Sequence, residues 1–135
     1  MTRHHVEYMI IGGYAVNLHG FPRLTHDIDF FVSASIENQK RLIESLIEFG
    51  FPKSSLGTTL FTSDKTILRF GIAPNRVEIF SEIPGVTWEE CWSSRIQSPI
   101  DGTEINWIGL AELRKNKAAC HRAKDLLDLE ELPKS

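Results

Sequence analysis

The segment IGGYAVNLHGFPRLTHDIDF, residues 11–30, decides how this chain folds. The apolar run 6–11 predicts a buried strand that stops at the glycine pair Gly12-Gly13. A short helix is expected over about 13–19, because a glycine and then a proline follow it and end it. A second strand is expected over 27–32, and it begins with the sequence DID.

Asp27 and Asp29 are separated by one residue in that second strand. Side chains alternate along a strand, so both carboxylates project from the same face. Two ionised carboxylates this close repel each other and raise each other's pKa unless a cation lies between them. Hard oxygen ligands select Mg²⁺ or Mn²⁺, and a pair of such ions serves phosphoryl transfer. The pair predicts a divalent metal site, although a D-x-D sequence is also found at solvated strand edges and helix caps.

Glu78 is the candidate third ligand of this site. It stands in the apolar strand RVEIF, where a carboxylate is costly unless it faces a functional cleft. Gly12 and Gly13 precede a predicted helix, and glycines there expose backbone N–H groups that bind phosphate oxygens. Each of these features alone is common in unrelated proteins, but their order and spacing together point to nucleotide chemistry.

The remaining segments predict a mixed sheet with helices, an α/β or α+β domain. Apolar residues recur at helical spacing over 35–49, where Ser35 is a candidate N-cap. With 135 residues and no repeat or linker, the chain is expected to form one domain, 1–135. The other predicted elements are a hairpin of strands 66–72 and 76–80, a short helix over 87–92, a hairpin of strands 96–100 and 103–107 around Asp101-Gly102, and a C-terminal segment of two helices over about 109–132.

The composition is that of an ordinary globular protein, with 41% apolar residues, 24% charged residues and a net charge of −3. That charge excludes a broadly basic surface, so nucleic acid would have to bind a local patch. Cys91 and Cys120 lie far apart without metal-ligand spacing, and free thiols are expected. The sequence has no apolar run of membrane-spanning length and no signal segment, which predicts a cytoplasmic protein.

The order of apolar strand, Gly-Gly, short helix, Asp-x-Asp strand and later acidic strand resembles the DNA polymerase β-type nucleotidyltransferase superfamily. Within it, GGYAVNLHG, THDIDFFV, NRVEIF and the stretch from Asn116 to Asp128 are similar to small bacterial nucleotidyltransferase-like proteins related to abortive-infection toxins and minimal nucleotidyltransferases. The similarity extends over nearly the whole chain. It implies the nucleotidyltransferase fold, a small mixed β-sheet flanked by helices.

The resemblance also implies a site of three carboxylates. Asp27 and Asp29 would hold two metal ions, Mg²⁺ or Mn²⁺. Glu78 would hold the catalytic one of the two and help to deprotonate the acceptor hydroxyl. The family more often has Asp at the third position, so Glu78 is a departure from the pattern, with a side chain one methylene longer.

Three further residues are candidates for contact with the nucleotide phosphates. Arg23 and Thr25 lie in the loop before the carboxylates, and arginine binds phosphate through two N–H groups at once. Solvation or turn hydrogen bonds explain these two residues equally well. Lys117 lies in the basic run 114–117, and such runs on helices usually face water. The resemblance makes Lys117 a candidate on the phosphate side.

The expected activity is transfer of a nucleoside monophosphate from an NTP such as ATP to a hydroxyl group, in a toxin–antitoxin or phage-defence setting. A chain of this length has few residues left to enclose a small acceptor, which favours a macromolecule, either a partner protein or an RNA. An antibiotic adenylyltransferase is the alternative enzyme. A non-catalytic binding module, such as an antitoxin-like subunit, is the alternative from a different class. The sequence does not fix the oligomeric state.

Overall fold

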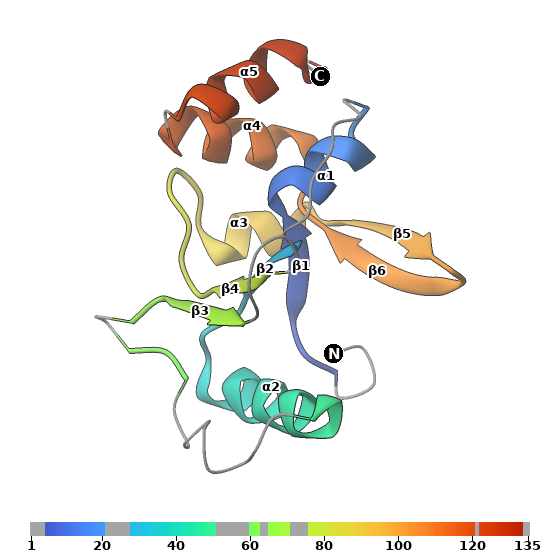
Figure 1. Cartoon of the computed structure of the whole chain (residues 1–135), viewed down its shortest axis with the longest axis vertical. Helices are drawn as coiled ribbons and strands as arrows, with labels where there is room; N and C mark the ends of the chain where they lie inside the picture. The colour runs from blue at the N-terminus through green and yellow to red at the C-terminus, as the bar shows by residue number, and fades with distance from the viewer. Residues whose placement is uncertain are drawn as a thin grey trace.

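The computed structural model describes residues 5–20, 28–50, 60–62, 65–70, 76–120 and 122–133, with Phe70 described by its backbone alone. These residues form one mixed sheet of six strands and five helices (Figure 1). The mixed α/β class predicted from the sequence is confirmed. Within the described ranges, none of the helices combines the length and the apolar character needed to cross a membrane.

The sheet is built around two central strands, β1 and β2. The strands lie in the order β3-β4-β2-β1-β6-β5, and β2 runs antiparallel to β1 and parallel to β4. Both predicted hairpins are present, β3–β4 and β5–β6. The strands are β1 (Tyr8–Ile11), β2 (Ile28–Val32), β3 (Ile67–Phe70), β4 (Val77–Phe80), β5 (Ile96–Ile100) and β6 (Thr103–Trp107).

The helices begin and end close to the residues that the sequence marks. Ser35 caps α2 by accepting a hydrogen bond from the Asn38 backbone N–H at 3.1 Å. Thr87 caps α3 in the same way, because its hydroxyl accepts a hydrogen bond from the Glu90 backbone N–H at 3.2 Å. The helices are α1 (Gly12–Leu18), α2 (Ile36–Phe49), α3 (Trp88–Ser93), α4 (Leu110–Cys120) and α5 (Ala123–Glu131).

Different helices cover the two faces of the sheet. Val32 of β2 belongs to a buried cluster with Leu42 of α2, so α2 covers the face on which Val32 lies. Phe31 points to the opposite face, where its ring meets that of Trp88 in α3 with the centroids 5.1 Å apart. Because side chains alternate along a strand, Asp29 lies on the same face as Phe31. The candidate metal ligand therefore faces away from α2.

The two C-terminal helices lie at the end of the sheet beside α1, as Figure 1 shows. The loop before α3 packs against α4 and holds it to the rest of the fold. The Asn116 side chain in α4 donates a hydrogen bond to the Pro84 carbonyl at 2.9 Å. Gly85 has a φ of +84°, and a Cβ at this position would overlap the Lys115 carbonyl of α4. This close packing sets the position of α4 relative to the strand β4, which leads into the loop.

Candidate functional site

Asp29 and Glu78 are direct neighbours across the sheet. They are register partners in the parallel pair of β2 and β4, so both side chains project from the same face. The same row continues to Ile11 of β1 on one side and to Arg69 of β3 on the other. The position next to Asp29 that the sequence suggests for Glu78 is therefore observed, whereas its role as a metal ligand stays a prediction.

Gly12 lies against the Asp29 carboxylate. Its φ is +69°, and a Cβ built on Gly12 would overlap Oδ2 of Asp29. Only glycine satisfies both conditions, because a positive φ is costly for other residues and no space exists for a side chain. The first glycine of the pair thus allows the carboxylate to lie at the start of α1.

Glu78 already has a cationic partner. Nε of Arg69 donates to Oε2 of Glu78 at 2.8 Å, directly across the β3–β4 hairpin. The Glu78 side chain is 16% exposed, whereas that of Arg69 is 60% exposed. The pair thus joins a nearly buried carboxylate to a guanidinium that water reaches easily.

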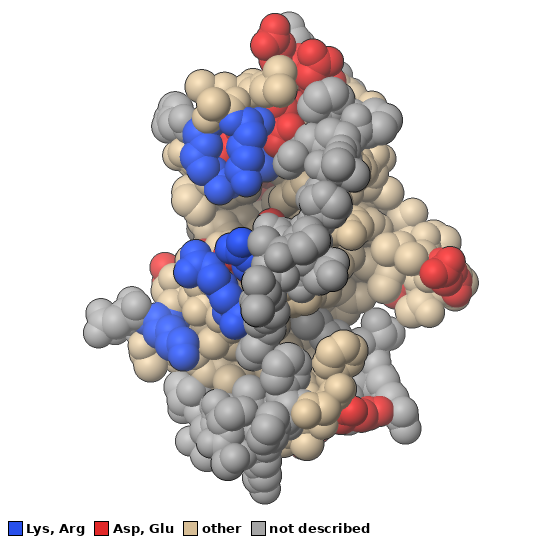
Figure 2. Space-filling model, in the orientation of Figure 1, with Lys and Arg blue, Asp and Glu red and all other residues tan. Residues whose placement is uncertain are grey.

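These residues open into a cavity of about 940 Å³ between the sheet and the C-terminal helices. Gly12, Gly13 and Lys117 line it, as do the carboxylates. Figure 2 shows Lys and Arg side chains gathered in two groups on this side of the molecule, one over the α4–α5 end and one over β3–β4. The charged residues described in the lining are Arg69, Arg76, Lys117, Arg122 and Lys124, with Asp29, Glu78 and Glu82.

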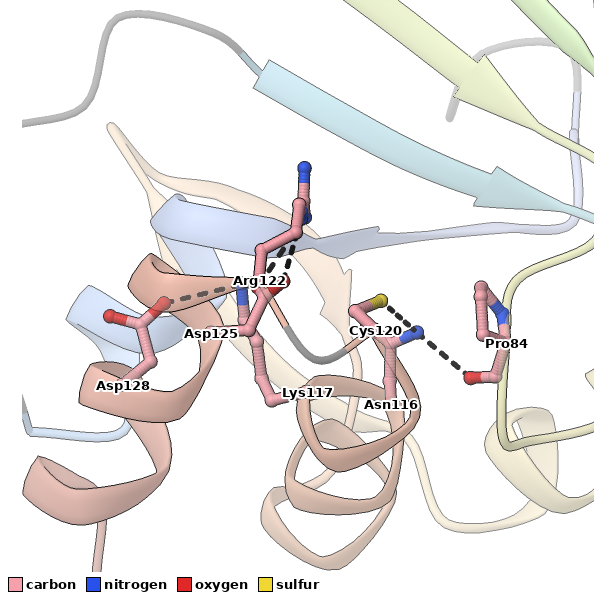
Figure 3. Close-up of polar contacts among 7 residues, drawn as sticks. All are labelled: Pro84, Asn116, Lys117, Cys120, Arg122, Asp125 and Asp128. Carbon is pink, nitrogen blue, oxygen red and sulfur yellow. Dashed lines mark hydrogen bonds and ion pairs between the residues drawn. The ribbon is translucent and has the colours of Figure 1, made fainter.

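The helical wall of the cavity contains a buried ionic cluster (Figure 3). Nζ of Lys117 lies 2.9 Å from Oδ1 of Asp125 and 3.2 Å from Oδ2 of Asp128, and all three side chains are buried. Arg122 holds the Asp125 carboxylate with two nitrogens, Nε at 2.6 Å and Nη2 at 3.3 Å. We call these four residues the helical cluster.

The helical cluster shifts the ionisation of its members. Burial by itself raises the pKa of Asp125, but hydrogen bonds from Arg122 and Lys117 outweigh burial and hold the pKa below its ordinary value. The hydrogen bond to Asp125 raises the pKa of Arg122, and the more distant charge of Asp29 adds to that rise. Arg122 therefore stands within electrostatic reach of the sheet wall.

The predicted phosphate ligands have different outcomes. Arg23 and Thr25 lie outside the described residues, as does Asp27. Gly12 and Gly13 line the cavity at the start of α1. Lys117 also lines the cavity, but it does not face water as basic runs usually do: its ammonium is held by two buried carboxylates. To contact phosphate as predicted, the Lys117 ammonium would have to bind phosphate while it is also held by these carboxylates.

The donor chemistry of the sheet wall fits a divalent metal ion. Asp29 and Glu78 offer carboxylate oxygens, the ligand type that Mg²⁺ and Mn²⁺ prefer. The contact of Gly12 with the Asp29 carboxylate, which we call the glycine cradle, leaves room for that carboxylate, and Asp29 lines the cavity. Among the described residues, which omit Asp27, no group of three or more His, Cys, Asp or Glu is arranged to hold a metal. With Asp27 outside the described residues, the structure places two of the three predicted carboxylates on this wall.

Sequence reasoning missed Arg69 as a member of the site. The available signal was a lone basic residue in the apolar strand ILRF, across a hairpin from a lone acidic residue in VEIF. Opposite charges at such positions pair directly when the register matches.

Comparison of the chain with protein-family models and with curated proteins finds no match in either.

Proposed function

We propose that this protein is a metal-dependent nucleotidyltransferase of the DNA polymerase β type. The observation that supports this most strongly is the row formed by Asp29 and Glu78 on adjacent strands, opening into a cavity lined by basic side chains. Paired carboxylates suit divalent cations, and basic side chains suit the phosphates of an NTP. The cavity volume of about 940 Å³ lies in the range of small-ligand sites.

The proposed reaction transfers a nucleoside monophosphate. The acceptor oxygen bonds to the α-phosphorus, the bond from that phosphorus to the bridging oxygen breaks, and pyrophosphate leaves. The metal ions would neutralise phosphate charge and acidify the acceptor hydroxyl. Asp29 and Glu78, with Asp27, would hold them, and Glu78 would also assist removal of the hydroxyl proton. Gly12 and Gly13 would contribute backbone N–H groups to the triphosphate.

The proposed acceptor is a hydroxyl of a macromolecule, a partner protein or an RNA. The described residues are used mainly for the sheet, its helices and the cavity walls, and they leave little chain to enclose a second small molecule. A large acceptor would approach from the solvent side and bring its own contact surface.

The test uses α-³²P-labelled NTPs with Mg²⁺ or Mn²⁺. The protein is incubated with bacterial RNA, with bacterial protein extract, and with a panel of aminoglycosides and lincosamides. Label in RNA or protein is expected, and Asp29→Asn should abolish it together with Mn²⁺ binding measured by calorimetry. Glu82→Gln is the matched control, because Glu82 lines the cavity outside the carboxylate row and its loss should leave labelling intact.

Three results would change the proposal. Label in an antibiotic alone would identify the small-molecule enzyme. NTP binding without label in any pool would identify a binding module. Unchanged Mn²⁺ affinity in the folded Asp29→Asn variant would refute the metal assignment.

A further inference from the structure

The structure assigns a second role to the ion pair on the sheet wall. We infer that Arg69 is an internal counter-ion of Glu78 and that the phosphates of an incoming nucleoside triphosphate take it over, so that nucleotide binding frees Glu78 for a divalent cation. The inference rests on the proposed function, since it concerns the order in which the same site gains its ligands.

Arg69 engages one of the two carboxylate oxygens that Glu78 could offer to a metal ion. Its Nε lies 2.8 Å from Oε2, and the two residues are register partners on the face that also bears Asp29. A carboxylate oxygen that accepts a hydrogen bond from a guanidinium has less electron density for a metal ion. The positive charge of Arg69 also repels a cation that approaches the same carboxylate.

The same geometry lets Arg69 leave. Arg69 lies on β3, an edge strand of the sheet, and 60% of its side chain is exposed to water. Because the guanidinium of this pair is exposed, Arg69 changes partner at little cost. Arginine has five N–H donors in a planar fork, and the contact with Glu78 engages the one at Nε. The exposed side chain already lines the cavity, so it can turn toward a ligand bound there.

A triphosphate offers Arg69 a better partner than Glu78. Phosphate oxygens match the planar guanidinium in a bidentate contact, and a triphosphate has more negative charge than one carboxylate. Arg69 and Arg76 line the cavity on the sheet side, so a triphosphate bound beside the carboxylates would meet both. Arg76 differs because it lies before β4, outside the pair with Glu78.

The exchange couples the two ligands. A cation at Glu78 releases Arg69 for phosphate, and a phosphate at Arg69 releases Glu78 for the cation, so each ligand raises the affinity for the other. Removing Arg69 should therefore strengthen metal binding in the absence of nucleotide. Removing the Glu78 charge should strengthen nucleotide binding in the absence of metal. Removing a charge elsewhere in the cavity should strengthen metal binding and nucleotide binding to a smaller extent.

The experiment measures the two ligands separately. Mn²⁺ binding without nucleotide is followed by electron paramagnetic resonance for the wild type, Arg69→Gln and the control Arg76→Gln. ATP binding in EDTA is followed by calorimetry for the wild type, Arg69→Gln, Glu78→Gln, the control Glu82→Gln and the double variant Arg69→Gln/Glu78→Gln. Unfolding curves of each variant verify that it is folded.

Specific shifts are expected. Arg69→Gln should bind Mn²⁺ about tenfold more tightly than the wild type, and Arg76→Gln within about twofold of it. Glu78→Gln should bind metal-free ATP about tenfold more tightly, with Glu82→Gln again within about twofold. In the Arg69→Gln background, Glu78→Gln should change ATP affinity by no more than about twofold, because the exchange partner is gone.

The outcomes separate this inference from the proposed function. Equal Mn²⁺ affinity in the wild type and Arg69→Gln, or a Glu78→Gln effect that persists without Arg69, would overturn the exchange while leaving a labelling enzyme intact. Equal effects of Arg69→Gln and Arg76→Gln would reduce the effect to general charge and also overturn it. Absence of both Mn²⁺ and ATP binding in every variant would overturn both proposals.

Discussion

The two walls of the cavity each contain an ionic group, and the groups differ in the access of water. On the sheet wall, Arg69 is 60% exposed and meets Glu78 through Nε. On the helical wall, Lys117 is 4% exposed, and both of its carboxylate partners are buried. An exposed cation changes partner at little cost, whereas a fully buried pair cannot lose a member without leaving an unpaired charge. Exposure therefore separates a group that can respond to a ligand from one that fixes the wall.

The helical cluster also shows how a fixed group can still affect the site. Asp125 is shared between Lys117 in α4 and Arg122 at the start of α5, so it connects the two helices. Arg122 lines the cavity, and its guanidinium is oriented by the Asp125 carboxylate. The buried part thus determines where an accessible cation is presented.

The largest expected effect tests whether the helical cluster fixes the wall. Lys117→Met would leave Asp125 and Asp128 buried without the ammonium between them. A cost of about 3–5 kcal/mol in the free energy of unfolding is expected, the usual result of removing one member of a buried ion pair. Urea unfolding measures it. Lys124→Met, an exposed neighbour, is the control and should stay within about 0.5 kcal/mol of the wild type.

The next effect tests whether the sheet wall serves chemistry rather than stability. Glu78→Gln should lower the rate of nucleotide transfer on the order of a hundredfold, the typical size of a lost general-base contribution. Its unfolding free energy should change by less than about 1 kcal/mol, because its partner is an exposed arginine. Equal rates in variant and wild type would place Glu78 outside the site.

The glycine cradle provides an intermediate effect. Gly12→Ala and Gly102→Ala both place alanine at a positive φ, +69° and +81°, at a cost of about 1–2 kcal/mol each. Only at Gly12 does the new Cβ overlap Asp29, whereas nothing lies near Gly102. Mn²⁺ affinity should therefore fall in Gly12→Ala and remain in Gly102→Ala. Equal Mn²⁺ affinities in the two variants would contradict the cradle.

The smallest expected effect concerns pH. Because the pKa of Asp125 is lowered in the folded protein, its charge contributes stability above the ordinary Asp value of 3.8, and that contribution is lost as the pH falls through the folded value. The stability difference between the wild type and Asp125→Asn should therefore be largest at neutral pH and shrink below about pH 4. Urea unfolding from pH 7 to pH 3 measures the difference. If this difference in unfolding free energy stayed constant from pH 7 to pH 3, the ionisation of Asp125 would not be coupled to folding.

Local signals in the sequence predicted most of the fold. The cap at Ser35 and the Asp101-Gly102 turn act within a few residues, and both have the predicted structure. Asp101 and Gly102 both have positive φ, as the mirror-image hairpin turn requires. Short-range chemistry of this kind can be read directly from the chain.

The site depends on contacts that local patterns do not contain. The pairing of Glu78 with Arg69 follows from the hairpin register, which a shift of one residue would abolish. The burial of Lys117 was missed because the inward face of α4 includes Glu112 and Asn116 as well as Leu113, so apolar periodicity does not mark it. The buried carboxylates that neutralise it come from the next helix.

The outer edge of the β5–β6 hairpin, which projects from the body in Figure 1, has a consequence for association between molecules. The two-residue turn is closed by the pair Ile100 and Thr103, which bond to each other through their backbones. Hydrogen-bonded and non-bonded pairs alternate along the hairpin, so the backbone of Pro99 faces the open edge of β5. Proline at this position has no N–H to offer. A strand from another chain would meet a gap in the row of donors, which protects the hairpin from intermolecular sheet growth even though Ile96 and Ile100 are exposed on it.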